Sequence, residues 1–272
     1  MAWETRMDKS ELPVVVMPYH DPEGEMVRHL EVILPDLKRM YRRAFVGVTP
    51  ATSAAQPAAI EWLAADPFFD ITYRETDTGV GEQFHTLYAH AAAACDLSDV
   101  LHLCFIDRVA YALETAHRTA FMKDVLAVRG MDTPLMFLRS EVAWRTHPQN
   151  YHDIEMMATR TGKWLFGKTL DFAWCHLVIQ AGLLREILPS VKNTDISMLA
   201  EMTLLLRDEL VSKDVDWLAW EDPFLLSCDA TQLKTERENS AQETRKRLAY
   251  IVPTLQLLMD VPGNSSPTIR RQ

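Results

Sequence analysis

Leu12-Pro-Val-Val-Val-Met-Pro-Tyr19 is the stretch from which the rest of the fold follows. A short β-branched run flanked by prolines predicts a buried strand, and His20-Asp-Pro-Glu-Gly24 after it predicts a turn. Similar apolar runs recur at 44–49, 68–73 and 99–106, and stretches with helical periodicity at 25–40, 57–65 and 82–95 separate them. Strands joined by helices in this order predict a parallel sheet covered on both faces, which is an α/β fold.

The second half of the chain is less regular. Its periodicity predicts helices over 109–128, 152–161, 171–188, 194–210 and 235–259, with strands at 133–139 and 215–220. We expect Pro35 to kink or end the helix at 25–40, and Thr194 to cap the helix that begins there. No repeat or Ser/Gly/Pro linker divides the chain. A single domain over 1–260 is therefore expected, with a change of character at 108 and a disordered tail over 261–272.

The composition of the 272-residue chain excludes several classes of protein. Apolar residues make up 48% and charged residues 24%, as in globular rather than disordered proteins. The 28 basic and 38 acidic residues give a net charge of −10, which argues against nonspecific nucleic-acid binding. No membrane span is expected, because the most apolar stretch, 170–188, contains Asp171, His176 and Arg185.

The N-terminus has no apolar segment of the kind that a signal peptide needs. The four cysteines have no zinc-site spacing and lie in apolar sequence; they are Cys95, Cys104, Cys175 and Cys228. Buried free thiols and a cytoplasmic location are therefore expected. The oligomeric state is left open, with a homodimer as one option.

Common nucleotide-binding and hydrolase motifs are missing, because the chain has no GxxxxGK(S/T), GxGxxG, GxSxG or HExxH. Attention therefore falls on the carboxyl ends of the predicted strands, where α/β proteins bind ligands. Gly79-Val-Gly81 precedes a helix there, in a place that can hold phosphate or simply form a turn. Asp107-Arg108 follows the fourth strand. Its carboxylate can hold a divalent cation or cap the next helix, and the residues alone leave both readings open.

These segments, in this order, resemble a GT-A glycosyltransferase of the nucleotide-diphospho-sugar transferase superfamily. The resemblance spans roughly residues 10–225 and implies a Rossmann-like GT-A fold, with a mostly parallel central sheet and a helical C-terminal part. In such a fold, residues 1–108 would form the nucleotide-binding half and 109–260 the acceptor-side half. The motifs that carry it are Pro18-Tyr-His-Asp-Pro22, Thr49-Pro50, Asp77-Thr-Gly-Val-Gly81 and Phe105-Ile-Asp-Arg108.

The resemblance also implies which residues contact a nucleotide-sugar donor. They follow the first, second and fourth strands or form the glycine loop: Pro18, Tyr19, His20, Asp21, Thr49, Asp77, Gly79, Gly81, Glu82 and Arg108.

Asp107 matches the last residue of the family's Asp-x-Asp motif and would bind Mg²⁺ or Mn²⁺. Phe105 replaces the first aspartate, so a further ligand is needed elsewhere. His176 stands where some family members supply a histidine ligand, although a core or helix-face histidine is the alternative. Asp214-Val-Asp216 is interpreted as a solvated strand entry.

Two later segments resemble the acceptor side of the family's site. Trp220-Glu221-Asp222-Pro223 resembles the late acidic motif, so that Glu221 or Asp222 would be the general base if the reaction inverts. A plain turn is the alternative. Arg139, Arg145 and His147 follow the fifth strand and would line an acceptor pocket, if they do not form an ordinary loop.

The function that the resemblance implies is transfer of a sugar from a nucleotide-diphosphate sugar to an unidentified acceptor, with a divalent metal bridging the diphosphate. The first alternative is a catalytically inactive module of the same fold that binds a nucleotide, a sugar phosphate or a partner protein. The second is a sugar nucleotidyltransferase. That class has a Gly-rich basic loop after the first strand, where this chain has His20-Asp-Pro-Glu-Gly24.

Overall fold

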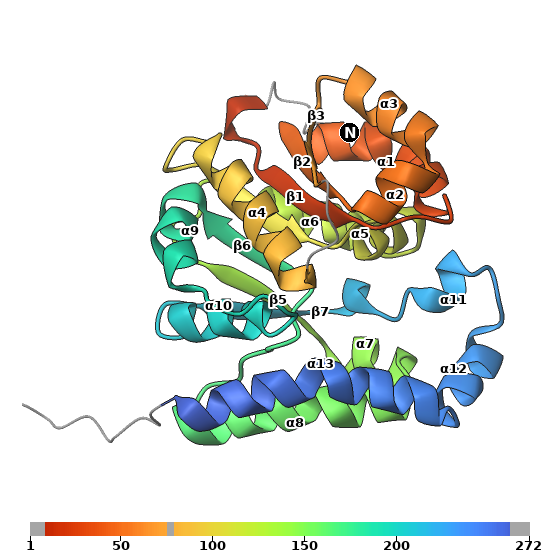
Figure 1. Cartoon of the computed structure of the whole chain (residues 1–272), viewed down its shortest axis with the longest axis vertical. Coiled ribbons are helices and arrows are strands. Elements are labelled where there is room, and N and C mark those ends of the chain that lie inside the picture. The colour runs from red at the N-terminus through yellow and green to blue at the C-terminus, as the bar shows by residue number, and fades with distance from the viewer. Residues whose placement is uncertain (1–8, 75–78, 262–272) are drawn as a thin grey trace, which may run out of the picture.

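The apolar runs of the sequence form a seven-stranded sheet in the computed structural model, which describes residues 9–74 and 79–261 (Figure 1). The strand order is β3-β2-β1-β4-β6-β5-β7. All strands run in one direction except β6, which lies antiparallel between β4 and β5. The predicted α/β class with a mostly parallel sheet is confirmed. The strands are β1 (Val14–Tyr19), β2 (Arg43–Val48), β3 (Phe69–Tyr73), β4 (Val100–Cys104), β5 (Leu135–Arg139), β6 (His176–Gln180) and β7 (Val211–Val215).

The first half of the chain alternates strands and helices as predicted. Pro35 lies inside a helix that continues to Met40, so of the two expectations, a kink or an end, the end is excluded. Buried Ile33 and Leu37 on either side of Pro35 hold this stretch against the sheet. Thr49 caps a short helix that was not predicted. The helices of this half are α1 (Met26–Met40), α2 (Pro50–Ala55), α3 (Pro57–Ala65) and α4 (Val80–Ala93).

The second half departs from prediction in one important place. Residues 171–188 were predicted to be one helix, but they form a loop, the strand β6 and the helix α9 (Ala181–Ile187). The run from His176 to Gln180 is short and rich in β-branched residues, and it pairs in the middle of the sheet. Tertiary pairing therefore overrides the helical periodicity of the surrounding residues.

Other boundaries in this half also differ. The helix predicted over 109–128 is two helices, α5 (Ile106–Glu114) and α6 (Arg118–Ala127). The helix predicted over 235–259 is also two, α12 (Ala230–Glu238) and α13 (Ala241–Asp260), because Ser240 caps a new helix. The strand predicted at 215–220 lies earlier in the chain, at β7. Thr194 does not cap a helix, because α10 (Met198–Leu206) begins four residues later. The remaining helices are α7 (Glu141–Thr146), α8 (Gln149–Phe166) and α11 (Asp222–Leu225).

Two apolar cores lie on the two sides of the sheet. One contains buried side chains of α4, α9 and α10, and the other those of α1, α5 and α6. Helices α8 and α13 lie side by side beyond one end of the sheet (Figure 1). They run parallel, because Tyr151 hydrogen-bonds Glu243 and Glu155 pairs with Arg247. The C-terminal part of the described residues is therefore helical.

Three earlier expectations concern single features. Cys95, Cys104 and Cys175 are buried free thiols as predicted, but Cys228 is exposed. Within 9–74 and 79–261, no helix is both long and apolar enough to span a membrane. The predicted disordered tail lies outside the described residues from 262 onward.

Candidate active site

A cleft of about 430 Å³ opens at the carboxyl ends of β1, β2 and β4. This is the point where the strand order turns from β2-β1 to β1-β4, and such a switch point is where α/β sheets bind ligands. The cleft is lined by residues that follow the three strands, together with the start of α4: Pro18, His20, Thr49, Val80, Gln83, Phe84, Phe105 and Asp107. Pro18, His20, Thr49 and Asp107 were predicted as site residues, and the structure brings them together.

The loops after β1 and β2 are tied to each other by side-chain hydrogen bonds. His20 Nδ1 lies 2.9 Å from Thr49 Oγ1. Thr52 Oγ1 lies 3.0 Å from Thr49 Oγ1 and accepts a 2.6 Å bond from the backbone N–H of Asp21. This network fixes one wall of the cleft, which leaves the exposed His20 ring at its rim.

Asp21 and Tyr19 have structural roles. The Asp21 carboxylate is 4% exposed and accepts bonds from the backbone N–H groups of Glu25, Met26 and Val27. It therefore caps the start of α1. The Tyr19 hydroxyl donates a 3.0 Å bond to the same carboxylate, and burial with this neighbour raises the pKa of Tyr19. Neither side chain lines the cleft, although both were predicted to contact a donor.

The glycine loop serves packing. A Cβ atom added to Gly79 would lie only 2.4 Å from the carbonyl oxygen of Thr194. A Cβ atom added to Gly81 would lie 2.1 Å from the carbonyl oxygen of Asp195, so a side chain fits at neither position. The backbone N–H of Glu82 donates to the Thr194 oxygen, and its carboxylate pairs with Arg74. The glycines are therefore needed because another loop approaches the start of α4. Asp77 lies outside the described residues.

Asp107 stands in the first turn of α5 and reaches the cleft. Its Oδ1 accepts a 2.8 Å bond from the backbone N–H of Arg108. Burial, and to a smaller extent the negative charge of Asp222, raises the pKa of the Asp107 carboxyl. A carboxylate that is partly desolvated beside a second one gains from a bound cation. Two such oxygen donors suit Mg²⁺ or Mn²⁺.

The late acidic motif is joined to the start of α5 by an ion pair. Glu221, 5% exposed, forms a close ion pair with Arg108. Asp222 is more accessible and lies 4.0 Å from Arg237. The Glu221 carboxylate is thus paired with the Arg108 guanidinium. The negative charge of Asp222 contributes to the raised pKa of Asp107.

A second cavity of about 310 Å³ adjoins the cleft, and Val80, Phe84 and Phe105 line both. Its charged and histidine side chains are Arg108, Arg139, His147, Glu155 and Arg247. We call it the arginine cavity.

Ion pairs hold the side chains of the arginine cavity in place. Arg139 donates to Glu155 at 2.5 Å and lies 4.2 Å from the Trp144 ring centre. Arg247 donates to the other oxygen of Glu155 at 3.2 Å, so the carboxylate is shared. The Nε atom of Arg247 is buried with no hydrogen-bond partner among the described residues.

His147 supplies a second unpartnered group in this cavity. It is 3% exposed, and its Nδ1 bonds the Ala143 carbonyl oxygen at 3.0 Å. Its Nε2 has no partner in the described part of the chain. Burial, helped by the nearby Arg139 and Arg108 charges, holds the pKa of His147 well below its usual value. Arg145, predicted beside it, is 78% exposed and pairs with Glu141 at the surface.

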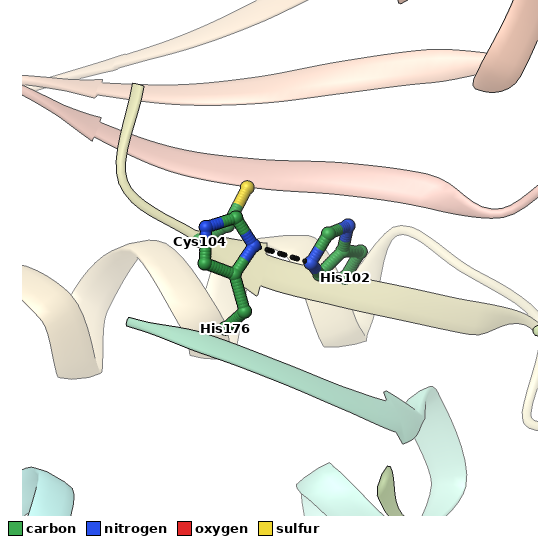
Figure 2. Close-up of side chains that lie close together, drawn as sticks. All are labelled: His102, Cys104 and His176. Carbon is green, nitrogen blue, oxygen red and sulfur yellow. Dashed lines mark hydrogen bonds between the residues drawn. The ribbon is translucent and has the colours of Figure 1, made fainter. Parts of the chain in front are cut away.

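His176 lies in the core, away from the linings of the cleft and the arginine cavity. It is fully buried on β6, where its Nδ1 is 2.9 Å from His102 Nε2 (Figure 2). Burial lowers the pKa of His102 to about 3 and that of His176 well below its usual value. The structure thus places His176 away from Asp107. Asp222 lines a neighbouring hollow with Arg237, and its negative charge contributes to the raised pKa of Asp107. Asp214 and Asp216 are exposed, and Asp216 accepts a bond from Ser140, as expected of a solvated segment.

Comparison with known proteins gives no match in sequence, either to a family model or to a curated protein. Solved structures do match. One is a mycobacterial protein, 14% identical with a TM-score of 0.53, covering 92% of this chain and 75% of that one. Another is glucosyl-3-phosphoglycerate synthase from Mycobacterium tuberculosis with Mn²⁺, UDP-glucose and phosphoglyceric acid, 13% identical with a TM-score of 0.51 over 94% and 84% of the two chains. The structure of the same enzyme with phosphoglyceric acid matches with a TM-score of 0.50 at 13% identity, and the match again covers 94% of this chain and 84% of that one.

The chain has a GT-A-like fold. At these identities the likeness concerns the fold alone. Sequence reasoning located the cleft of this fold but missed two features of the arginine cavity. Arg247 was not among the predicted site residues, yet it shares a face with buried Ile251, Thr254 and Leu258 at helical spacing. Glu155 sits in the same way beside buried Ile154 and Ala158 on α8.

Proposed function

We propose that this protein is a glycosyltransferase that uses a nucleotide-diphosphate sugar as donor. The observation that carries the proposal is the pairing of two adjoining cavities in a GT-A-like fold. One, at the strand switch point, contains Asp107, and the other contains three arginines. A transferase needs two such places, because donor and acceptor must meet at one reacting carbon atom.

The donor would lie in the cleft, with its nucleotide against the loops that follow β1 and β2. His20 and Thr49 are the polar groups of that wall, and their mutual hydrogen bond holds them in place before a ligand arrives. Support comes from the similarly folded glucosyl-3-phosphoglycerate synthase, whose structure contains UDP-glucose and Mn²⁺.

Asp107 and Asp222 would hold a divalent cation at the diphosphate. Such a cation neutralises charge on the leaving nucleotide and orients it. Asp222 takes the place of the carboxylate that Phe105 removes from the Asp-x-Asp motif. Glu221 acts differently: its ion pair with Arg108 orients a guanidinium at the edge of the arginine cavity.

The acceptor would occupy the arginine cavity. Its guanidinium groups keep N–H donors beyond those used in their ion pairs, and His147 Nε2 and Arg247 Nε have no partner among the described residues. Such a lining favours a small, oxygen-rich acceptor, and an anionic group would pair with the guanidiniums.

The experiment is a measurement of nucleoside diphosphate release from UDP- and GDP-sugars with Mn²⁺. Each donor is offered with phosphoglycerate, glycerol phosphate or a neutral sugar as acceptor. We expect release that depends on both acceptor and metal, with a phosphorylated acceptor preferred to a neutral one. Tight donor binding without release in any combination would contradict the proposal and favour a binding module.

A further inference from the structure

Three metal-ligating side chains meet in the core between β4 and β6. His102 and Cys104 are two residues apart on β4, so their side chains point to the same face of the sheet. Cys104 is paired directly opposite His176 of β6, which places His176 on that face as well. Figure 2 shows the three side chains converging, with His102 and His176 joined by a hydrogen bond. Their ligand atoms all lie within 4.8 Å of one another.

The hydrogen bonds of this cluster are incomplete. The Tyr41 hydroxyl lies 2.7 Å from His102 Nδ1, and His102 Nε2 lies 2.9 Å from His176 Nδ1. The chain of bonds then stops, because His176 Nε2 is buried and has no partner among the described residues. Whichever nitrogen atoms carry the protons, the chain ends on an unsatisfied group. Such a group is costly in an apolar surrounding, and here the surrounding includes the rings of Phe121, Phe137 and Trp217.

We propose that His102, Cys104 and His176 form a binding site for a transition-metal ion of zinc type, separate from the donor cleft. Imidazole and thiolate are the ligands that such ions prefer, whereas Mg²⁺ and Mn²⁺ prefer oxygen. The site would use Nε2 of His102, Sγ of Cys104 and one ring nitrogen of His176, with a fourth position open.

Metal binding would replace the hydrogen bond between His102 Nε2 and His176 Nδ1, and it requires only small movements. Metal–nitrogen and metal–sulfur bonds of about 2.0 and 2.3 Å put ligand atoms of a tetrahedral site about 3.3–3.6 Å apart. The widest separation here is 4.8 Å at most, so the side chains need to close by about 1 Å, within the reach of side-chain rotation. Tyr41 would accept the Nδ1–H of His102, which directs Nε2 to the metal as hydrogen bonds around metal sites do.

The protons are accounted for, and the occupied site carries a net charge of +1. Both imidazoles bind in their neutral form and each keeps one proton. Cys104 binds as thiolate, so each M²⁺ releases one proton, from the Cys104 thiol. The bound ion would link β4 to the antiparallel strand β6. Strand β4 leads directly into α5, whose first turn contains Asp107.

The site is tested by metal analysis of the protein as purified from zinc-supplemented cultures and dialysed against metal-free buffer. We expect one equivalent of zinc. Cobalt-loaded protein should show a thiolate-to-cobalt charge-transfer band in the near ultraviolet. Both signals should be lost in Cys104→Ala, and both should be kept in Cys95→Ala, a matched buried cysteine. Asp107→Asn should also keep both, because the site does not use the donor cleft.

X-ray absorption of the zinc protein identifies the ligands without any variant, so the test survives misfolding of Cys104→Ala. One sulfur shell near 2.3 Å and nitrogen shells near 2.0–2.1 Å are expected. The proposal is overturned by a folded wild-type protein without stoichiometric metal, by a spectrum without sulfur, or by a charge-transfer band that persists in Cys104→Ala.

Discussion

Asp21 shows how a single residue can follow a family motif and yet serve the fold. The resemblance implied contact with a nucleotide, but the carboxylate oxygens of Asp21 accept backbone N–H groups at the start of α1, from Glu25, Met26 and Val27. Sequence alone does not separate these roles, because an aspartate after a strand and before a helix suits either. Asp107, in the first turn of the helix after β4, lines the cleft.

Asp21→Ala should therefore cost stability. We expect a loss of about 2–3 kcal/mol in the free energy of unfolding, because the start of α1 loses its cap and the Tyr19 hydroxyl loses its acceptor. Urea denaturation measures this, with Asp208→Ala as an exposed control that should change little. Unchanged stability in Asp21→Ala would show that the cap is not needed.

His147 should make stability depend on pH. Its pKa in the folded protein is well below the value of about 6.5 expected for the unfolded chain, so the unfolded chain binds the proton first. This contribution is fully present above pH 6.5 and is lost on acidification. Between pH 7.5 and 5.5 the wild type should lose about 1.4 kcal/mol more than His147→Gln. Denaturant midpoints at the two pH values measure the difference, and equal losses would place a charged His147 in the folded protein.

Among the elements, those of the first half followed from sequence because each strand is a continuous apolar run between turns. The strand β6 did not, since its five residues lie within a longer stretch of helical periodicity. Its pairing between β4 and β5 is a long-range contact that no local pattern encodes. The cluster of His102, Cys104 and His176 was not predicted for the same reason. The three side chains meet only when β6 pairs with β4 in the observed register.

Helix α13 places Arg247 on its buried face, although most charges of this helix are solvated. Arg247→Gln should raise the acceptor KM at least ten-fold and leave the donor Kd unchanged, because Arg247 lines the arginine cavity and not the cleft. Arg245→Gln on the exposed face is the matched control. Steady-state kinetics with a phosphorylated acceptor gives the comparison. An equal rise in both variants would mean that bulk charge, rather than the cavity, attracts the acceptor.

At the scale of the whole molecule, the sheet order brings together segments that are far apart in the chain. The ends of β1, β2 and β4 form the cleft, and the loop after β7 carries Glu221 and Asp222 to the same edge. The resemblance predicted this gathering, and the structure confirms the fold. It could not predict that His176 lies in the core while the charge of Asp222 reaches Asp107, because that depends on how β6 pairs and how the loop after β7 folds.

The central claim is that this edge of the sheet binds a nucleotide-diphosphate sugar through a divalent cation at Asp107. Calorimetric titration with UDP- and GDP-sugars, with and without Mn²⁺, tests it most directly, using the wild type and Asp107→Asn. We predict that one donor binds the wild type, at least ten-fold more tightly with Mn²⁺, and that Asp107→Asn loses this metal dependence while its thermal melt is unchanged. If the folded wild type binds none of the donors, or if Asp107→Asn binds one with the same metal dependence, the claim is wrong.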